Sequence, residues 1–359
     1  MKLSATIRKG GPLLLAPLAL ALDYSDILPP IWTFLAALSA IAVLADWVRR
    51  GTEQVAEHAG ATIGSLLNVS FGNAAELTLA LFVLAKAQTR IVQAQITGSI
   101  IGTTLLFLGL SALVGGLRHE RQKFSQAQVG LLSTLLLLVA VAILLPATFD
   151  ATERALAPGA NRELSDEQLS LCVSVVLLLL YFAHLVYVLI THRDMFAVGE
   201  RQGRPEWSLP LGLGVMIGGT LAIAIESELV TARLSESASL LGLTPVFMGV
   251  VVLAVVGTIA DLFASVAFAR SDRMDIAVGT CVGSAIQIAL VVAPVLVLAS
   301  WAIGHPMNLV FGSPIDLFAV AASAFVVRAI AADGETTWYE GFLLVGVYLL
   351  FALAYFFEG

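Results

Sequence analysis

Charged residues are scarce in this sequence. Asp, Glu, Lys and Arg make up 13% of the 359 residues, whereas the hydrophobic types reach 58%. A soluble protein carries roughly 25% charged residues, so the composition excludes a soluble protein and indicates one that resides in a lipid bilayer.

Cysteine is nearly absent. The two cysteines, Cys172 and Cys281, each lie in an apolar stretch without a second thiol nearby, which excludes a disulfide framework and a thiolate metal cluster. No basic run of the kind that binds nucleic acid is present, and the net charge is −7. No pair of nucleophile and base is visible, so an enzyme is not expected, and no resident cofactor is expected.

Long apolar runs fill most of the chain. Stretches such as Leu131–Pro146, Leu171–Ile190 and Phe342–Phe357, with their flanks, are long enough for helices that cross about 30 Å of hydrocarbon. We therefore predict an all-α membrane protein with about eleven transmembrane helices. The predicted spans are 11–24, 28–48, 62–86, 91–114, 127–148, 167–190, 209–232, 244–268, 274–303, 314–331 and 338–357.

The basic residues predict an orientation. With the N-terminus in the cytoplasm, most of the 19 Lys and Arg residues fall in cytoplasmic segments, as the positive-inside rule describes. The start of the chain also resembles a signal peptide, but this topology requires the first helix to be retained. The expected location is a bacterial plasma (inner) membrane, with a vacuole-like compartment as the alternative.

An internal repeat is the strongest feature. Segments 72–77 (Gly-Asn-Ala-Ala-Glu-Leu) and 257–262 (Gly-Thr-Ile-Ala-Asp-Leu) share a glycine with an acidic residue four positions later. A Gly-Ser pair follows each acidic residue after the same interval, at 98–99 and at 283–284. Both segments recur at an offset of 185 residues, which indicates two copies of one unit.

The repeat predicts how the chain is organised. We expect an N-terminal transmembrane helix over 1–25, a first five-helix repeat over 26–190, a polar cytoplasmic linker over 191–208 and a second five-helix repeat over 209–359. Because five is an odd number, the second repeat is expected to be inverted in the membrane relative to the first, as in many secondary transporters.

Each repeat places one carboxylate, Glu76 or Asp261, inside an apolar span. An ionised side chain there costs at least about 2.5 kcal/mol on insertion scales, so a functional role is expected. Ca²⁺ takes roughly 6–8 oxygen ligands, and the motifs offer oxygens but no thiolate or imidazole, which argues against zinc and copper. The predicted cation ligands are Glu76, Asp261, Asn73, Thr258, Ser99, Ser284, Gln287 and Thr103.

The same two carboxylates are candidates for carrying protons. Two facing carboxylates titrate as a coupled pair, so protons and a cation compete for one site, and two protons balance one divalent ion. Elsewhere, Glu53 and Glu57 either gather cations before the third span or form a solvated helix face. Glu226 and Glu228, near the outer end of the seventh span, are weaker candidates for lining a pathway.

The motifs resemble a known family. Segments 54–58 (Gln-Val-Ala-Glu-His), 67–77 (Leu-Asn-Val-Ser-Phe-Gly-Asn-Ala-Ala-Glu-Leu) and 96–100 (Ile-Thr-Gly-Ser-Ile) look like the first repeat of the cation/proton exchanger family of Ca²⁺/H⁺ antiporters, within the Ca²⁺:cation antiporter superfamily. Segments 272–275, 282–290 and 293–294 look like its second repeat. The resemblance implies eleven helices, an inverted repeat, alternating access and a central site where Glu76 and its partner bind Ca²⁺ or protons.

The second repeat departs from the pattern of that family. Where the antiporters usually read Gly-Asn-Ala-Ala-Glu-His, this sequence has Thr258, Asp261 and Leu262, which resemble the second repeat of the Na⁺/Ca²⁺ exchangers. Thr103 also stands where the antiporters usually carry Asn. Because Leu262 stands where that family has His, the expectation that protons take the route used by the family is weakened.

The leading hypothesis is a secondary active antiporter that exchanges Ca²⁺ for H⁺, with Ca²⁺, protons and the lipid bilayer as its partners. The alternative is a Na⁺/Ca²⁺ exchanger or a Na⁺(K⁺)/H⁺ antiporter, in which sodium or potassium replaces one of the two ions. A channel or a non-transporting membrane scaffold is the hypothesis from a different class. The sequence does not give the oligomeric state.

Overall fold

The chain folds almost entirely into helices. The structure, a computed structural model, describes residues 11–25, 28–156, 163–191, 205–311, 313–330 and 332–358. Within them, eight helical segments are long and apolar enough to cross a membrane, and each of the eleven predicted spans falls on helix. The prediction of an all-α membrane protein is confirmed. Residues 1–10 and most of the predicted linker, from 192 to 204, lie outside the described residues.

The elements follow one another in a simple order, with η marking a 3-10 helix (η1) or a π-helix (η2 to η5). They are η1 (Gly11–Leu14), α2 (Leu15–Ser25), α3 (Pro30–Ala59), α4 (Ala61–Phe71), α5 (Ala74–Ala85), α6 (Thr89–Ile101), η2 (Gly102–Phe107), α7 (Leu108–Gly116), β1 (Gln122–Lys123), α8 (Gln126–Leu156), α9 (Glu163–Val186), η3 (Tyr187–Thr191), α11 (Leu209–Leu241), α12 (Pro245–Phe247), η4 (Met248–Leu253), α13 (Ala254–Arg270), α14 (Met274–Gln287), η5 (Ile288–Val292), α15 (Ala293–Ile303), α16 (Pro314–Ile330), β2 (Glu335–Thr336) and α17 (Trp338–Glu358). The two short strands pair antiparallel.

Two predicted spans differ from the helices that form. The span predicted over 28–48 continues as α3 to Ala59, because Asp46 and Arg49 pair along the helix and allow it to extend beyond the apolar stretch. The span predicted over 62–86 is divided into α4 and α5 at Gly72 and Asn73, two residue types with low helix propensity.

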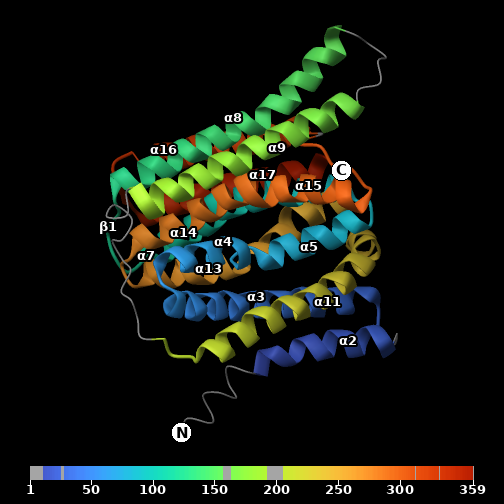
Figure 1. Ribbon diagram of the computed structural model, residues 1–359, viewed down its shortest axis with the longest axis horizontal. Coiled ribbons are helices and arrows are strands. Elements are labelled where there is room, and N and C mark those ends of the chain that lie inside the picture. Colours follow the sequence, from blue (N-terminus) through green and yellow to red (C-terminus); the bar gives the residue numbers. More distant parts are fainter. Residues whose placement is uncertain are drawn as a thin grey trace.

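Helices α3 and α11 pack side by side along their length, next to α2 at the lower edge of Figure 1. Gly51 of α3 lies against the backbone of Gly212 and Met216, and Val48 lies against Gly219. Residue numbers fall along α3 as they rise along α11, so the two helices are antiparallel. Glycine at these contacts lets the two backbones approach closely, as small residues do between membrane helices.

The centre of the molecule is formed by the spans Thr89–Gly116 (α6, η2 and α7) and Met274–Ile303 (α14, η5 and α15). They are the most buried of the candidate spans. Buried residues make up 83% and 72% of their most apolar stretches, compared with 17% in the span that contains α9. Both central spans contain a π-helical segment, η2 or η5, that begins within one helical turn after the repeated Gly-Ser motif. Such segments inside α-helices are frequent at functional sites.

Contacts between helices occur in matched pairs. Helix α7 packs on α17 as α15 packs on α9, α6 packs on α16 as α14 packs on α8, and α5 packs on α11 as α13 packs on α3. In each pair, a contact between one helix of the first predicted repeat and one helix of the second recurs between the equivalent helices of the opposite repeats. Two copies of one unit that face each other across a twofold axis produce contacts of this kind.

Candidate cation site

The break between α4 and α5 positions the first repeated motif. The backbone N–H of Gly72 donates to the carbonyl of Asn68 at 2.7 Å and ends α4. Asn73 is then the N-cap residue of α5, which leaves Glu76 in the first turn of that helix. The free N–H groups at a helix N-terminus favour a carboxylate there, so the break provides part of the stabilisation that Glu76 needs.

Glu76 is buried between the two predicted repeats. Its side chain is 1% exposed, and neither carboxylate oxygen has a hydrogen-bond partner among the described residues. Gly257 of α13 packs directly on it, since a Cβ added at Gly257 would lie 3.1 Å from the Cα of Glu76. An ionised carboxylate buried without a partner is costly, so this side chain requires either a proton or a cation.

Asp261 faces a polar cavity of about 160 Å³ and is partly exposed to it. The cavity is bounded by α3, by the break between α4 and α5, and by α13 and α14. It extends along α13 and α14 from Asp261 and Gln287 toward Phe268 and Gly279, near the loop that joins the two helices. The lining residues are Arg49, Glu53, Asn68, Gly72, Asn73, Asp261, Ala264, Phe268, Gly279, Thr280, Gly283, Ser284 and Gln287.

Side-chain hydrogen bonds join the two repeated motifs across this cavity. The amide Nδ2 of Asn73 donates to Oε1 of Gln287 at 2.8 Å, and the hydroxyl of Ser284 donates to Oδ1 of Asn73 at 3.5 Å. Four of the eight predicted ligands, namely Asp261 and these three residues, therefore share one cavity. Their carboxylate, amide and hydroxyl oxygens are hard ligands of the type that Ca²⁺ prefers.

The other four predicted ligands are buried and do not line the cavity. The Thr258 hydroxyl donates to the carbonyl of Ala254, and the Thr103 hydroxyl donates to that of Ser99, so both are engaged within their own helices. The Ser99 hydroxyl is buried and interacts with the carboxylate of Glu76, although no hydrogen bond of standard geometry joins the two. That all eight bind a cation stays a prediction.

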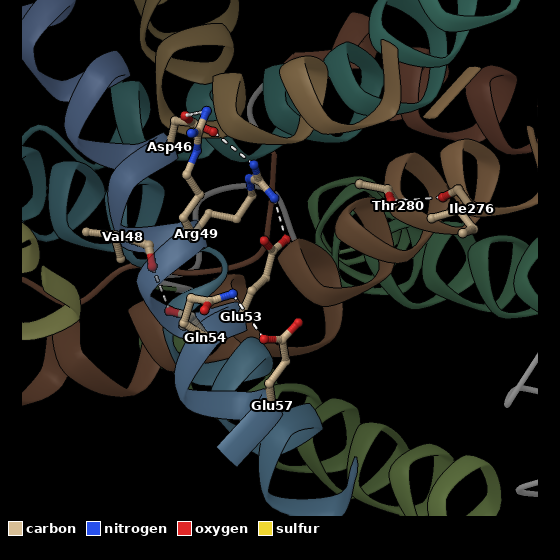
Figure 2. A network of polar contacts seen from close by, with 10 residues as sticks. Asp46, Val48, Arg49, Glu53, Gln54, Glu57, Ile276 and Thr280 are labelled. Carbon is tan, nitrogen blue, oxygen red and sulfur yellow. Dashed lines mark hydrogen bonds and ion pairs between the residues drawn. The ribbon is translucent and has the colours of Figure 1, made fainter. Parts of the chain in front are cut away.

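Several cavity residues were not predicted as part of the site, among them the polar residues Arg49, Asn68 and Thr280. The predicted topology assigned Arg49 to a loop at the membrane surface, whereas α3 continues past it and carries it to the cavity wall. Glu53, one of the two acidic residues in the 53–57 pair, also lines the cavity. Glu57 does not, and accepts a hydrogen bond from Gln54 at 3.1 Å (Figure 2).

The two repeated glycines before the π-helical segments have different surroundings. Gly98 lies so close to the backbone carbonyl of Val250 on η4 that a Cβ would overlap with it, whereas Gly283 has open space beside it and lines the cavity. At the repeat offset, the segment that corresponds to η4 is part of α4. Helix α6 packs on η4, but α14 has no comparable contact with α4. The cavity lies where this second contact is missing.

Among the described residues, Asp261 and Glu53 are the carboxylates that line the cavity. The described residues contain no group of three or more His, Cys, Asp and Glu side chains placed to hold a metal ion. Glu226 of α11 is buried, at 1% exposed, with one oxygen unpartnered among the described residues, and it does not line the cavity. A cation in the cavity would therefore rely on one or two carboxylates supplemented by neutral oxygens.

Comparison with known proteins gives consistent matches. The family described as sodium/calcium exchanger protein matches residues 29–190 and 211–357. The chain is 38% identical to a protein of Aphanothece halophytica named Ca²⁺/H⁺ antiporter, over 90% of each chain. It is 37% identical to the Ca²⁺/H⁺ antiporter ChaA of Bacillus subtilis, over 88% of this chain and 89% of that protein.

Solved structures show the same arrangement of helices. The structure of native YfkE superposes with a TM-score of 0.80 at 32% identity, over 95% of this chain and 97% of that chain. A second structure of YfkE is described as that of a Ca²⁺/H⁺ antiporter protein. The H⁺/Ca²⁺ exchanger CAX matches with a TM-score of 0.72 at 14% identity, over 98% of this chain and 91% of that chain, a likeness of fold alone.

Proposed function

The chain belongs to the sodium/calcium exchanger protein family, and from that premise we propose that it is a secondary active antiporter that exchanges Ca²⁺ for H⁺. Relatives at 37% and 38% identity bear the name Ca²⁺/H⁺ antiporter. The observation that carries the proposal is the meeting of the two repeated motifs, with Asp261 at a polar cavity and Glu76 buried without a partner beside Gly257. The role is that of a transporter and not of an enzyme.

Ca²⁺ and protons use the same carboxylates. Ca²⁺ enters the cavity and takes oxygens from Asp261, Asn73, Ser284 and Gln287, and Glu76 completes the site when it loses its proton. The ion must displace protons because a protonated carboxylate binds cations poorly, and two carboxylates can release two protons for one Ca²⁺. The transported ions are the substrates, and no resident cofactor is proposed.

The proposed alternating access is supported by the unequal contacts of the two repeated glycines. Gly98 packed on η4 closes one side of the site, while the space beside Gly283 leaves the other side open. In the alternate state, α4 packs on Gly283 and η4 separates from Gly98, so that the site opens to the opposite side. The matched helix contacts support this exchange and the division into an N-terminal helix and inverted repeats over 26–190 and 209–359.

The open end of the cavity is proposed to face the cytoplasm. Gln122 donates to the carbonyl of Ala269, which brings the segment before α8 against the loop between α13 and α14. That end of the molecule carries Arg118, Arg121, Lys123, Arg270 and Arg273, in agreement with the positive-inside rule. A bacterial inner membrane with a cytoplasmic N-terminus remains the proposed location.

Sodium is the competing coupling ion, because Thr258, Asp261 and Leu262 depart from the usual second motif. The test is the internal pH of sodium-free proteoliposomes, followed with a trapped dye while Ca²⁺ is added outside. An antiporter that exports protons for Ca²⁺ raises the internal pH. Ca²⁺ uptake is measured in parallel. Uptake that requires internal Na⁺ and leaves the internal pH unchanged would establish sodium coupling, and uptake that requires neither a proton nor a sodium counter-ion would indicate a channel.

A further inference from the structure

A fixed positive charge lies on the wall of the cation cavity. Arg49 of α3 lines the same cavity as Asp261, and its side chain is 17% exposed. An arginine is always protonated, and here its charge interacts electrostatically with that of Asp261. A cation that approaches Asp261 through this cavity therefore meets a like charge.

The guanidinium is held in place by carboxylates of its own helix. Arg49 donates from Nη2 to Oδ1 of Asp46 at 2.9 Å and from Nη1 to Oε1 of Glu53, as Figure 2 shows. Its Nε is buried without a partner among the described residues. Glu53 is thus already paired with a cation that belongs to the protein, which limits its availability to a transported ion.

The neighbouring arginine, Arg50, differs from Arg49 in its exposure and in its position relative to the cavity. Arg50 pairs with the second oxygen of Asp46 at 2.6 Å, but its side chain is 44% exposed and does not line the cavity. Solvent screens a charge at the surface far more strongly than one in a partly buried cavity. Arg50 is therefore a matched control with the same charge, the same helix and a shared partner.

We propose that Arg49 is a tethered counter-charge that competes with Ca²⁺ for the carboxylates of the cavity, so that it lowers the affinity for Ca²⁺ and promotes release on this side. The inference rests on the proposed function. Two carboxylates, Asp261 and Glu53, line the cavity with one guanidinium, which compensates one of the two negative charges when the cavity holds no ion. A bound Ca²⁺ is either repelled by the positive charge of Arg49 or displaces its guanidinium from Glu53.

The test is calorimetric titration of the purified full-length protein with Ca²⁺ at fixed pH. Arg49→Gln is expected to bind Ca²⁺ about tenfold more tightly, as the Coulomb energy of a divalent ion and a unit charge in a partly solvated cavity implies. Arg49→Lys keeps the charge and should stay near the wild-type affinity, as should Arg50→Gln. Arg49→Met is a second neutral variant in case the first does not fold.

The direction of the change separates this role from a structural one, since damage to the fold weakens binding and does not tighten it. The counter-charge is contradicted by a folded neutral variant that binds Ca²⁺ with unchanged or weaker affinity, or by Arg50→Gln with equal tightening. If neither the wild type nor Arg50→Gln binds Ca²⁺, the proposed function itself is overturned. A wild type that binds and exchanges Ca²⁺ beside an unaltered Arg49→Gln overturns only the inference about Arg49.

Discussion

Asn73 and Gln287 lie 214 residues apart in the sequence and share a 2.8 Å hydrogen bond, with Asn73 Nδ2 as the donor. Asn73 occupies the N-cap position of α5, and Gln287 ends α14, so the bond joins the two repeated motifs directly. It leaves Oδ1 of Asn73 beside Ser284 at the cavity. The bond therefore fixes the position of two amide oxygens that the site offers to a cation.

The hydrogen bond between Asn73 and Gln287 is expected to make the effects of substituting its two residues on stability non-additive. Asn73→Ala and Gln287→Ala should each lower thermal stability, and the double variant should cost less than the two single variants combined. The difference is about 1 kcal/mol, the usual net contribution of a hydrogen bond. Thermal unfolding of the four proteins in one detergent measures it, and strictly additive effects would argue against a direct bond.

The two repeated glycines are expected to respond differently to enlargement. Gly283→Val should fold and bind Ca²⁺, because open space surrounds Gly283, but its exchange should slow at least about tenfold because α4 can no longer close on α14. Gly98→Val should instead destabilise the protein by more than about 1 kcal/mol through its overlap with Val250. Thermal stability and exchange rate are measured side by side, and full exchange by Gly283→Val would contradict the proposed closure.

The hydroxyl side chains are expected to fall into two groups. Thr258→Val and Thr103→Val should change Ca²⁺ affinity less than about twofold, because neither residue lines the cavity and both hydroxyls donate to carbonyls of their own helices. Ser284→Ala should weaken binding more, since Ser284 faces the cavity. Titration with Ca²⁺ at one pH ranks the three, and a large loss in Thr258→Val would mean that this hydroxyl turns toward the ion.

Ca²⁺ affinity is expected to fall as the pH falls. A carboxylate binds Ca²⁺ in its ionised form, so protons that bind Asp261 or Glu76 displace the ion and are released when it returns. With two protons exchanged, the apparent dissociation constant rises by up to about a hundredfold for each unit of acidification in the range where both carboxylates take up protons. Binding measured from neutral to acidic pH gives this slope, and an affinity independent of pH would exclude competition between protons and Ca²⁺.

The sequence predicted the fold class and the central motifs because both leave strong local signals. Apolar length identified the spans, and the constant offset between Glu76 and Asp261 identified the two motifs that meet at the site. Asp261, Asn73, Ser284 and Gln287 were predicted individually, and the structure brings them to one cavity.

Other features could not be predicted because they depend on packing. The polar end of α3 resembled a surface loop, so Arg49 was missed, although Asp46 and Glu53 at helical spacing on either side of it suggest a paired arginine within a helix. The repeated sequence does not indicate that the space beside Gly98 is filled and that beside Gly283 is open, because this difference depends on which side of the site is closed. These equivalent positions of the two repeats carry the same residue in the sequence, but in a single conformation of an exchanger they have different surroundings.

The most direct test of the account is uptake of radiolabelled Ca²⁺ into sodium-free proteoliposomes with an acidic interior. The wild type is compared with Glu76→Gln and Asp261→Asn, and Glu226→Gln serves as the control because Glu226 is also a buried carboxylate of a span but lies outside the cavity. The account predicts uptake that depends on the pH gradient in the wild type and in Glu226→Gln, and none above protein-free liposomes in the other two. Uptake that persists in Glu76→Gln and Asp261→Asn, or that ignores the pH gradient, would contradict exchange of Ca²⁺ for protons through this pair of carboxylates.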